Sequence, residues 1–531
     1  MKMALVPVTV LAAVTLSAGA VTDEELAKLV AEDVARPVRP VGENGQREFW
    51  NGNAIWFMYP PSFDFPVVEG AAGYRFMIFG EGGAFTSFEA DTPHATLAPV
   101  WDKVPVGMTE VWCEAKLPWQ GKCMKRSFRS FWKMAPYRPG IYPKAPRDYR
   151  ESAQLAYEYQ LNLDFTQKFL ASGQPDMTYK LNCYPSKMHA ETILSFLKYA
   201  KLVPERSEAA FKLARTAGEY LLSVMNPPEA ALPYFTPTYI GDFWAAKDYS
   251  GQTMLLYPSR SAKAFAALYE ATKEQKYLTA AKQIADAYLK LQGEDGTWSL
   301  KLYERDAKPV NDNRLLPTDA IEMFEEIFRL TGDRRYREAA DRAFAYIERG
   351  PLADWNWEGQ FEDVLPSAKY LNLTKHPALE VALILCRRFP GDEKRIAQAR
   401  ELLRFAEDQF VCWERPWAAA RIGQGEGGCW HEWMMTPAVV EQYFYREVVD
   451  ASAAKLIRGY LALYQATGNP LDLAKARTLG DAIVRVQRDN GRIPTIWCKV
   501  CGESLQSDWT NCMLASAEAL VELSMAAESG R

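Results

Sequence analysis

The chain has 531 residues, of which 48% are hydrophobic and 13% aromatic, so it holds ample core material for more than one domain. Lys and Arg number 62 against 67 Asp and Glu, and the formal charge of −5 comes from signs that are mixed along the sequence. This balance argues against the basic surface that attracts nucleic acid or an anionic membrane.

Residues 1–20 have the pattern of a signal peptide, with a basic start, an apolar middle and Ala18-Gly19-Ala20 before an acidic segment. We therefore expect a periplasmic or secreted protein. No later run reaches the roughly 18 uninterrupted apolar residues of a membrane span, so we expect no association with a membrane.

Residues 45–135 alternate between apolar and polar side chains in short runs separated by Gly and Pro, which is typical of strands. The order "FDFPVVEGAAGYRFMIF" followed by "VWDKVPVGMTEVWCEA" resembles a fibronectin type III-like β-sandwich. Cys113 and Cys123 flank "EAKLPWQGK" and are expected to form a disulfide in a hairpin. Residues 136–149 contain four prolines and are predicted to be a linker.

From residue 150 onward the apolar residues recur at a spacing of three and four, the period of packed helices. The runs come in pairs, and similar tight turns recur in "ATKEQKYL", "LTGDRRYR" and "ATGNPLDL". The predicted helices are 150–171, 187–204, 207–226, 258–275, 277–292, 317–332, 334–349, 376–390, 393–413, 449–468, 472–488 and 507–528.

Twelve helices make six hairpins, and the first helix can pair with the last to close a ring. The pattern resembles the (α/α)6 toroid of many glycoside hydrolases, polysaccharide lyases and sugar epimerases. We therefore predict a mainly α protein, with an (α/α)6 toroid over 150–528 preceded by a small β-sandwich. The resemblance implies a fold and leaves the reaction open.

In such a ring the long connections precede the inner helices and lie on one face, which we call the mouth. The repeated "YPS" of residues 184–186 and 257–259 suits helix starts, where backbone N–H groups lack partners within the helix. The side chains near these starts are expected at the mouth as substrate-binding residues: Tyr184, Lys187, His189, Tyr257, Arg260 and Asp319.

The later long connections are rich in Trp and carboxylic acids. Large aromatic side chains in loops usually mark a binding site, and their faces can stack on sugar rings; the alternative is that they fill gaps between helices. The expected substrate-binding residues here are Trp355, Trp357, Glu362, Asp363, Trp430, Trp509 and Asn511.

Glycoside hydrolysis needs one protonated and one ionised carboxyl group. Glu432, beside His431, is the predicted acid or base, and Glu358 is the second candidate. β-Elimination from a uronic acid is the main alternative, with His189 or His431 as base and Arg260 facing the carboxylate. A glycan-binding protein without catalysis is a third hypothesis.

The sequence is similar in architecture to unsaturated glucuronyl hydrolases and β-L-arabinofuranosidases. The latter use a zinc held by cysteines and a glutamate, but the spacing of Cys429, Cys498 and Cys501 does not match well enough to assign ligands. We expect no metal and no cofactor. The predicted function is hydrolysis of a glycosidic bond in a poly- or oligosaccharide that contains uronic acid.

Overall fold

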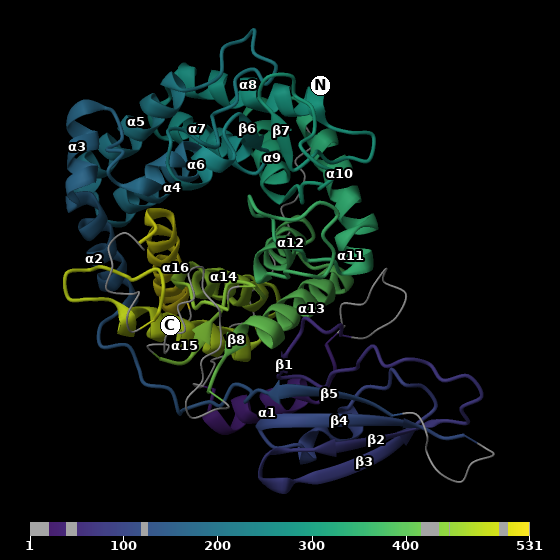
Figure 1. Cartoon of the computed structure of the whole chain (residues 1–531). Helices are drawn as coiled ribbons and strands as arrows, with labels where there is room; N and C mark the ends of the chain where they lie inside the picture. The colour runs from purple at the N-terminus through teal and green to yellow at the C-terminus, as the bar shows by residue number, and fades with distance from the viewer. Residues whose placement is uncertain are drawn as a thin grey trace, which may run out of the picture.

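A computed structural model describes residues 21–38, 50–117, 126–415, 435–444, 446–498 and 508–529. Within them, helices pair into hairpins around a ring, and a small sheet lies at one side of it (Figure 1). The inner helices are α4 (Pro185–Leu202), α7 (Tyr257–Thr272), α9 (Thr318–Thr331), α12 (Lys375–Arg388), α14 (Asp450–Thr467) and α16 (Thr510–Ser529). The outer helices are α2 (Tyr149–Asn162), α5 (Ser207–Ser223), α8 (Gln275–Leu291), α10 (Arg334–Arg349), α13 (Glu393–Phe410) and α15 (Pro470–Val486).

The ring closes where the last inner helix meets the first elements of the toroid. Helix α16 packs against the outer helix α2 and against both inner neighbours, α14 and α4. The predicted mainly α fold with an (α/α)6 toroid is therefore confirmed. The expected first helix is divided in two, because the backbone leaves the helical conformation at Leu163 before α3 (Asp164–Ser172) begins.

A repeated threonine turn builds three of the hairpins. In each, the Thr hydroxyl donates to the carbonyl four residues earlier at 2.7 Å and accepts the N–H two residues later at 3.2 Å. The intervening residue adopts positive φ, which glycine tolerates best. That residue is Gly332 (φ 72°) and Gly468 (φ 69°) in two turns but Lys273 (φ 62°) in the third.

We therefore expect Lys273→Gly to raise the free energy of unfolding by roughly 0.5–1 kcal/mol, since an L side chain is strained in this conformation. Lys273 is exposed, so the substitution removes little packing. Gly332→Lys is the matched control and should lower stability, because an added Cβ meets nothing within 4 Å and only the backbone strain changes. Urea denaturation measures both, and equal stabilities would contradict the prediction.

The N-terminal strands form one sheet in the order β1-β5-β4-β2-β3. The strands are β1 (Trp56–Phe57), β2 (Tyr74–Phe79), β3 (Phe85–Ala90), β4 (Gly107–Ala115) and β5 (Arg126–Lys133), and only β1 pairs in parallel. The second sheet of a sandwich is not found among the described residues. Segments outside the strands contact the inner face instead: a loop that carries Phe63 and Phe65, and a 3-10 helix (Ala98–Lys103) that carries Trp101.

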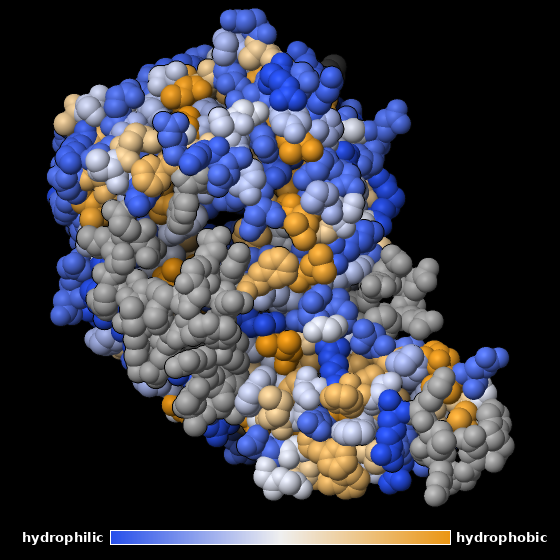
Figure 2. Space-filling view, viewed as in Figure 1, coloured by the Kyte–Doolittle hydropathy of each residue, from blue (hydrophilic) through white to orange (hydrophobic). Residues whose placement is uncertain are grey.

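The opposite face of the sheet is open. Phe79, Phe85 and Phe128 are 42%, 56% and 64% exposed, and hydrophobic side chains gather over the sheet in the surface view (Figure 2). Cys113 on β4 is a buried free thiol. The predicted disulfide with Cys123 is therefore wrong for this structure, and Cys123 itself lies outside the described residues.

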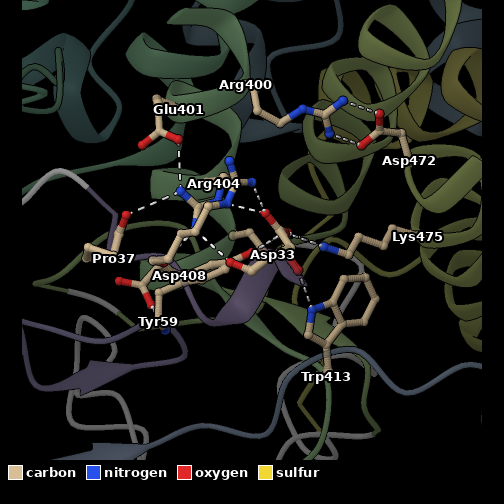
Figure 3. A network of polar contacts seen from close by, with 12 residues as sticks. Asp33, Pro37, Tyr59, Arg400, Glu401, Arg404, Asp408, Trp413, Asp472 and Lys475 are labelled. Carbon is tan, nitrogen blue, oxygen red and sulfur yellow. Dashed lines mark hydrogen bonds and ion pairs between the residues drawn. The ribbon is translucent and has the colours of Figure 1, made fainter. Parts of the chain in front are cut away.

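A buried polar network fastens the N-terminal part to the ring (Figure 3). Helix α1 (Asp23–Val34) brings Asp33 to Arg404 of α13, with Oδ1 and Nε 2.9 Å apart. Lys475 of α15 contacts Glu407 at 2.8 Å between Nζ and Oε2. The Tyr59 hydroxyl lies 3.1 Å from Asp33 Oδ2 and 3.2 Å from Glu407 Oε2. Helix α1, the segment that carries Tyr59 and the outer helices α13 and α15 thus contact one another through this network.

Shorter elements lie in the connections between the hairpins. They are α6 (Trp244–Asp248), α11 (Pro351–Asp354), and the strand pairs β6 (Gln252–Met254) with β7 (Lys301–Tyr303) and β8 (Val411–Cys412) with β9 (Ala438–Val439). No helix among the described residues has the length and apolar character to cross a membrane.

Candidate active site at the ring mouth

Contacts between neighbouring helices show that the inner helices start at the same end of the ring. Tyr184, before α4, stacks on Trp509, before α16, with ring centroids 6.1 Å apart. Arg260 in the first turn of α7 hydrogen-bonds to Asp319 at the start of α9. The expected mouth therefore exists, and the prolines at the starts of α4 and α7 fit positions that need no N–H donor.

An aromatic and cationic corner forms where α4 meets α16. Lys187 Nζ lies 4.1 Å from the centroid of the Trp509 ring and 5.3 Å from that of Tyr184. Lys187 and Trp509 are half-buried, so both remain accessible to solvent. Among the described residues no carboxylate lies within ion-pair distance of Lys187. A cation over an aromatic face is thus open to an anionic ligand.

Two glutamates of the mouth have their main chain held by buried lysines. Lys301 Nζ donates to the Glu362 carbonyl at 2.6 Å, and Lys375 Nζ donates to the Glu441 carbonyl at 2.9 Å. Burial lowers the pKa of Lys375 to about 8. The Glu362 carboxylate accepts the Tyr184 hydroxyl at 2.7 Å. These contacts give Glu362 a fixed place and orientation in the mouth.

Below the corner, the two predicted residues Arg260 and Asp319 are paired with each other. Arg260 Nε donates to Asp319 Oδ2 at 2.8 Å, and Lys263 Nζ donates to Asp319 Oδ1 at 2.7 Å. Burial acts to raise the pKa of Asp319, but these two cations outweigh it and hold the pKa far below its usual range. Asp319 is therefore an ionised structural partner rather than a proton donor.

Glu191 is a carboxyl group of the inner helix α4 that lies near Lys187 in the sequence. It follows Lys187 by one helical turn, so both side chains lie on the same face of α4. It is half-buried, and no described residue forms a hydrogen bond or ion pair with it. Burial raises its pKa, and the nearby charge of Glu518 raises it further, against the opposing effect of Arg458.

The structure corrects the expectation for Trp355 and Trp357. They are 5% and 0% exposed, and Trp355 packs edge-on against Phe405 of the outer helix α13. Side chains this deeply buried fill the space between helices and cannot stack on a sugar. Glu358 has a structural role in the same connection, since its carboxylate accepts the N–H groups of Leu371 and Asn372, each at 2.9 Å.

His189 also lies away from the expected position. It is 4% exposed, its ring lies 4.9 Å from that of Phe169 and 4.8 Å from that of Tyr220, and burial lowers its pKa to about 3. The prediction that His189 binds substrate or acts as a base at the mouth is therefore wrong: its position on α4 turns it toward the outer helices.

The remaining predicted residues lie in different surroundings. Tyr257 is buried beneath Arg260, whose Cζ lies 5.7 Å from its ring centroid, and Asp363 is exposed. Asn511 is half-buried, and its Oδ1 has no hydrogen-bond partner among the described residues. Trp430, His431 and Glu432 lie outside the described residues, so their roles stay predictions.

No group of three or more potential metal ligands occurs among the described residues. Cys498 is buried, and Cys429 and Cys501 fall outside the described ranges. Sequence reasoning missed Glu191, Lys301, Lys375 and Glu441. Of these, only Glu191 had a signal, namely its spacing of four from Lys187.

The fold places the chain among (α/α)6 toroid proteins. No protein-family model matches the sequence, and no curated protein matches it. Solved structures with a similar fold include cellobiose 2-epimerase from Spirochaeta thermophila (16% identity, 71% of this chain and 98% of that one, TM-score 0.49). A second is a family 76 glycoside hydrolase from a bovine Bacteroides thetaiotaomicron strain (12% identity, 91% of this chain and 99% of that one, TM-score 0.47). A third is unsaturated glucuronyl hydrolase from Streptococcus agalactiae (11% identity, 70% of this chain and 91% of that one, TM-score 0.45). Similarity at this level carries no argument about activity.

Proposed function

We propose that the ring mouth is the active site of a carbohydrate-processing enzyme that hydrolyses a glycosidic bond next to an acidic sugar. The observation that carries this proposal is Lys187, a cation held over the ring of half-buried Trp509 without a carboxylate partner among the described residues. The aromatic face suits the apolar side of a sugar ring, and the ammonium group suits a uronic acid carboxylate.

The acid and base roles are assigned to two carboxyl groups of this mouth in different surroundings. Glu191, with its raised pKa and no described partner, is assigned as the proton donor to the leaving oxygen. Glu362, which accepts the Tyr184 hydroxyl, is assigned as the base or nucleophile. Glu432 stays a prediction for either role.

Hydrolysis is favoured over β-elimination because one of the two candidate bases, His189, is enclosed by Phe169 and Tyr220. The test is to incubate the protein with uronic-acid oligosaccharides and measure new reducing ends together with ultraviolet absorbance. Reducing ends without new absorbance are expected. Growth of absorbance would indicate elimination, which creates a conjugated double bond, and binding without any product would indicate a glycan-binding protein. Export, expected from residues 1–20, is part of the proposal.

Lys187→Met should raise KM for an acidic substrate by roughly ten- to hundredfold, the scale of a lost hydrogen bond to a charged group. For the matched neutral sugar, in which the carboxylate is reduced to an alcohol, the same variant should raise KM much less. Lys180→Met is the control, because Lys180 Nζ also lies over an aromatic ring, 4.9 Å from the Phe243 centroid, but is exposed. Equal losses for the acidic and neutral substrates would contradict the assignment of Lys187.

A further inference from the structure

A second polar site lies behind the mouth, where the ring closes. A cavity of about 30 Å³ lies between α2, α3, α4, α5 and the start of α16. Its lining includes the apolar side chains Phe165, Phe169, Met188 and Leu213 and, among several polar residues, Gln160 and His189. Neither of these two polar side chains has a role in the proposed reaction.

Both of these side chains line the cavity and carry a buried polar atom without a partner among the described residues. His189 is 4% exposed and Gln160 is 3% exposed, and neither His189 Nε2 nor Gln160 Oε1 has a hydrogen-bond partner among the described residues. The Gln160 amide is oriented, since its Nε2 lies 3.3 Å from Thr166 Oγ1 and 3.4 Å from Thr510 Oγ1. Leaving a buried polar atom unpaired costs about 1–3 kcal/mol, so two of them in one cavity call for an occupant.

We propose that the cavity binds ordered water that bridges His189 Nε2 and Gln160 Oε1. A cavity needs roughly 10–15 Å³ to hold one water and the water needs two or more polar partners, conditions that this cavity meets. Water donates to the Gln160 oxygen, and it either donates to or accepts from the imidazole nitrogen, so it fits either tautomer of a neutral histidine. The volume excludes a sugar.

The bridge has a structural consequence at the point of ring closure. It links α4 to α2, and through Gln160 to Thr510 at the start of α16. Tyr179 completes the seam, because its hydroxyl accepts the Thr510 N–H at 3.0 Å and donates to the Asp508 carbonyl at 2.7 Å. The water therefore lies directly behind Trp509 and supports the segment that carries it.

The test is a double-mutant cycle with His189→Leu and Gln160→Met, followed by thermal unfolding. If one water bridges both groups, each single variant lowers the melting temperature and the double variant loses less than the sum. Leu385→Met, in the buried core of α12 and away from this cavity, should be additive with Gln160→Met. Additive losses for His189 and Gln160 would overturn the proposal.

A second measurement does not depend on the variants folding. A high-resolution crystal structure of the unaltered protein should show water within hydrogen-bond distance of both His189 Nε2 and Gln160 Oε1, and crystals under xenon pressure should leave the site free of xenon. Xenon bound in the cavity, or a cavity without density, would show that it is dry and would contradict the bridge.

Discussion

Replacing Glu191 by glutamine is expected to lower kcat by roughly a hundredfold or more, the scale of losing a general acid. Glutamine keeps the size and polarity of the side chain but cannot donate the acidic proton. No described residue forms an ion pair or hydrogen bond with Glu191, so the variant should unfold at nearly the temperature of the unaltered protein. Steady-state kinetics and a thermal melt on the same preparation separate the two effects.

The pH dependence of the rate is a second test of Glu191 as the general acid. Because burial and Glu518 raise the pKa of Glu191, the carboxyl stays protonated to a higher pH than an ordinary glutamate. The rate should therefore fall as the pH rises through that pKa, and this limb should vanish in Glu191→Gln. Glu208→Gln, at an exposed position on α5, should keep both rate and profile. Full activity in Glu191→Gln would refute the assignment.

Lys475→Met is expected to lower the free energy of unfolding by about 3–5 kcal/mol, because removing one partner of a buried ion pair leaves an uncompensated charge. The Lys475 side chain is 4% exposed and lies 2.8 Å from Glu407, whose side chain is 2% exposed. The substitution would also remove a cation from Asp33, because Lys475 Nζ lies 3.6 Å from Asp33 Oδ2. Urea unfolding measures the change.

The control for this variant is Lys144→Met, where the side chain is 84% exposed and its nearest carboxylate, Asp481, lies 3.9 Å away. Exposed pairs of this kind contribute roughly 0–1 kcal/mol. If both variants unfolded at the same urea concentration, the network of Figure 3 would not be what holds the N-terminal part to the ring.

The same network predicts how acid affects stability. Burial acts to raise the pKa of Asp33, but the charges of Lys475 and Arg404 outweigh it and lower the pKa below its usual value. A carboxyl with a lowered folded-state pKa stabilises the fold above its unfolded-state pKa of about 3.9 and loses that contribution as the pH falls through the folded-state value. Asp33 should thus contribute to acid unfolding in the unaltered protein and less so in Lys475→Met.

The ring was predictable from the sequence because its determinants are local and repeated. The threonine turns at Thr272, Thr331 and Thr467 mark hairpins whose bonds span only a few residues. The helix starts at "YPS" are equally local, so the positions of Tyr184, Lys187 and Arg260 followed from them. Helical spacing also pointed to the charged face of α4, although Glu191 was not recognised on it.

The parts that could not be predicted depend on contacts between distant segments. Trp355 and Trp357 look like loop aromatics in the sequence, yet the outer helix α13 covers them. The hydrogen bond from Lys301 to the Glu362 carbonyl joins residues 61 positions apart, and no periodic pattern in the sequence links them. The sheet has no second sheet over its inner face because segments outside the strands cover that face. The alternation of apolar and polar residues within strands does not indicate which other segments will pack on them.

The most direct test of the central claim is a crystal structure of Glu191→Gln with a uronic-acid oligosaccharide that the unaltered protein cleaves. Our account predicts a sugar ring stacked on Trp509, its carboxylate within ion-pair distance of Lys187 Nζ, and the scissile oxygen facing residue 191. An oligosaccharide bound elsewhere, for example on the exposed phenylalanines of the sheet, with the mouth empty, would contradict it.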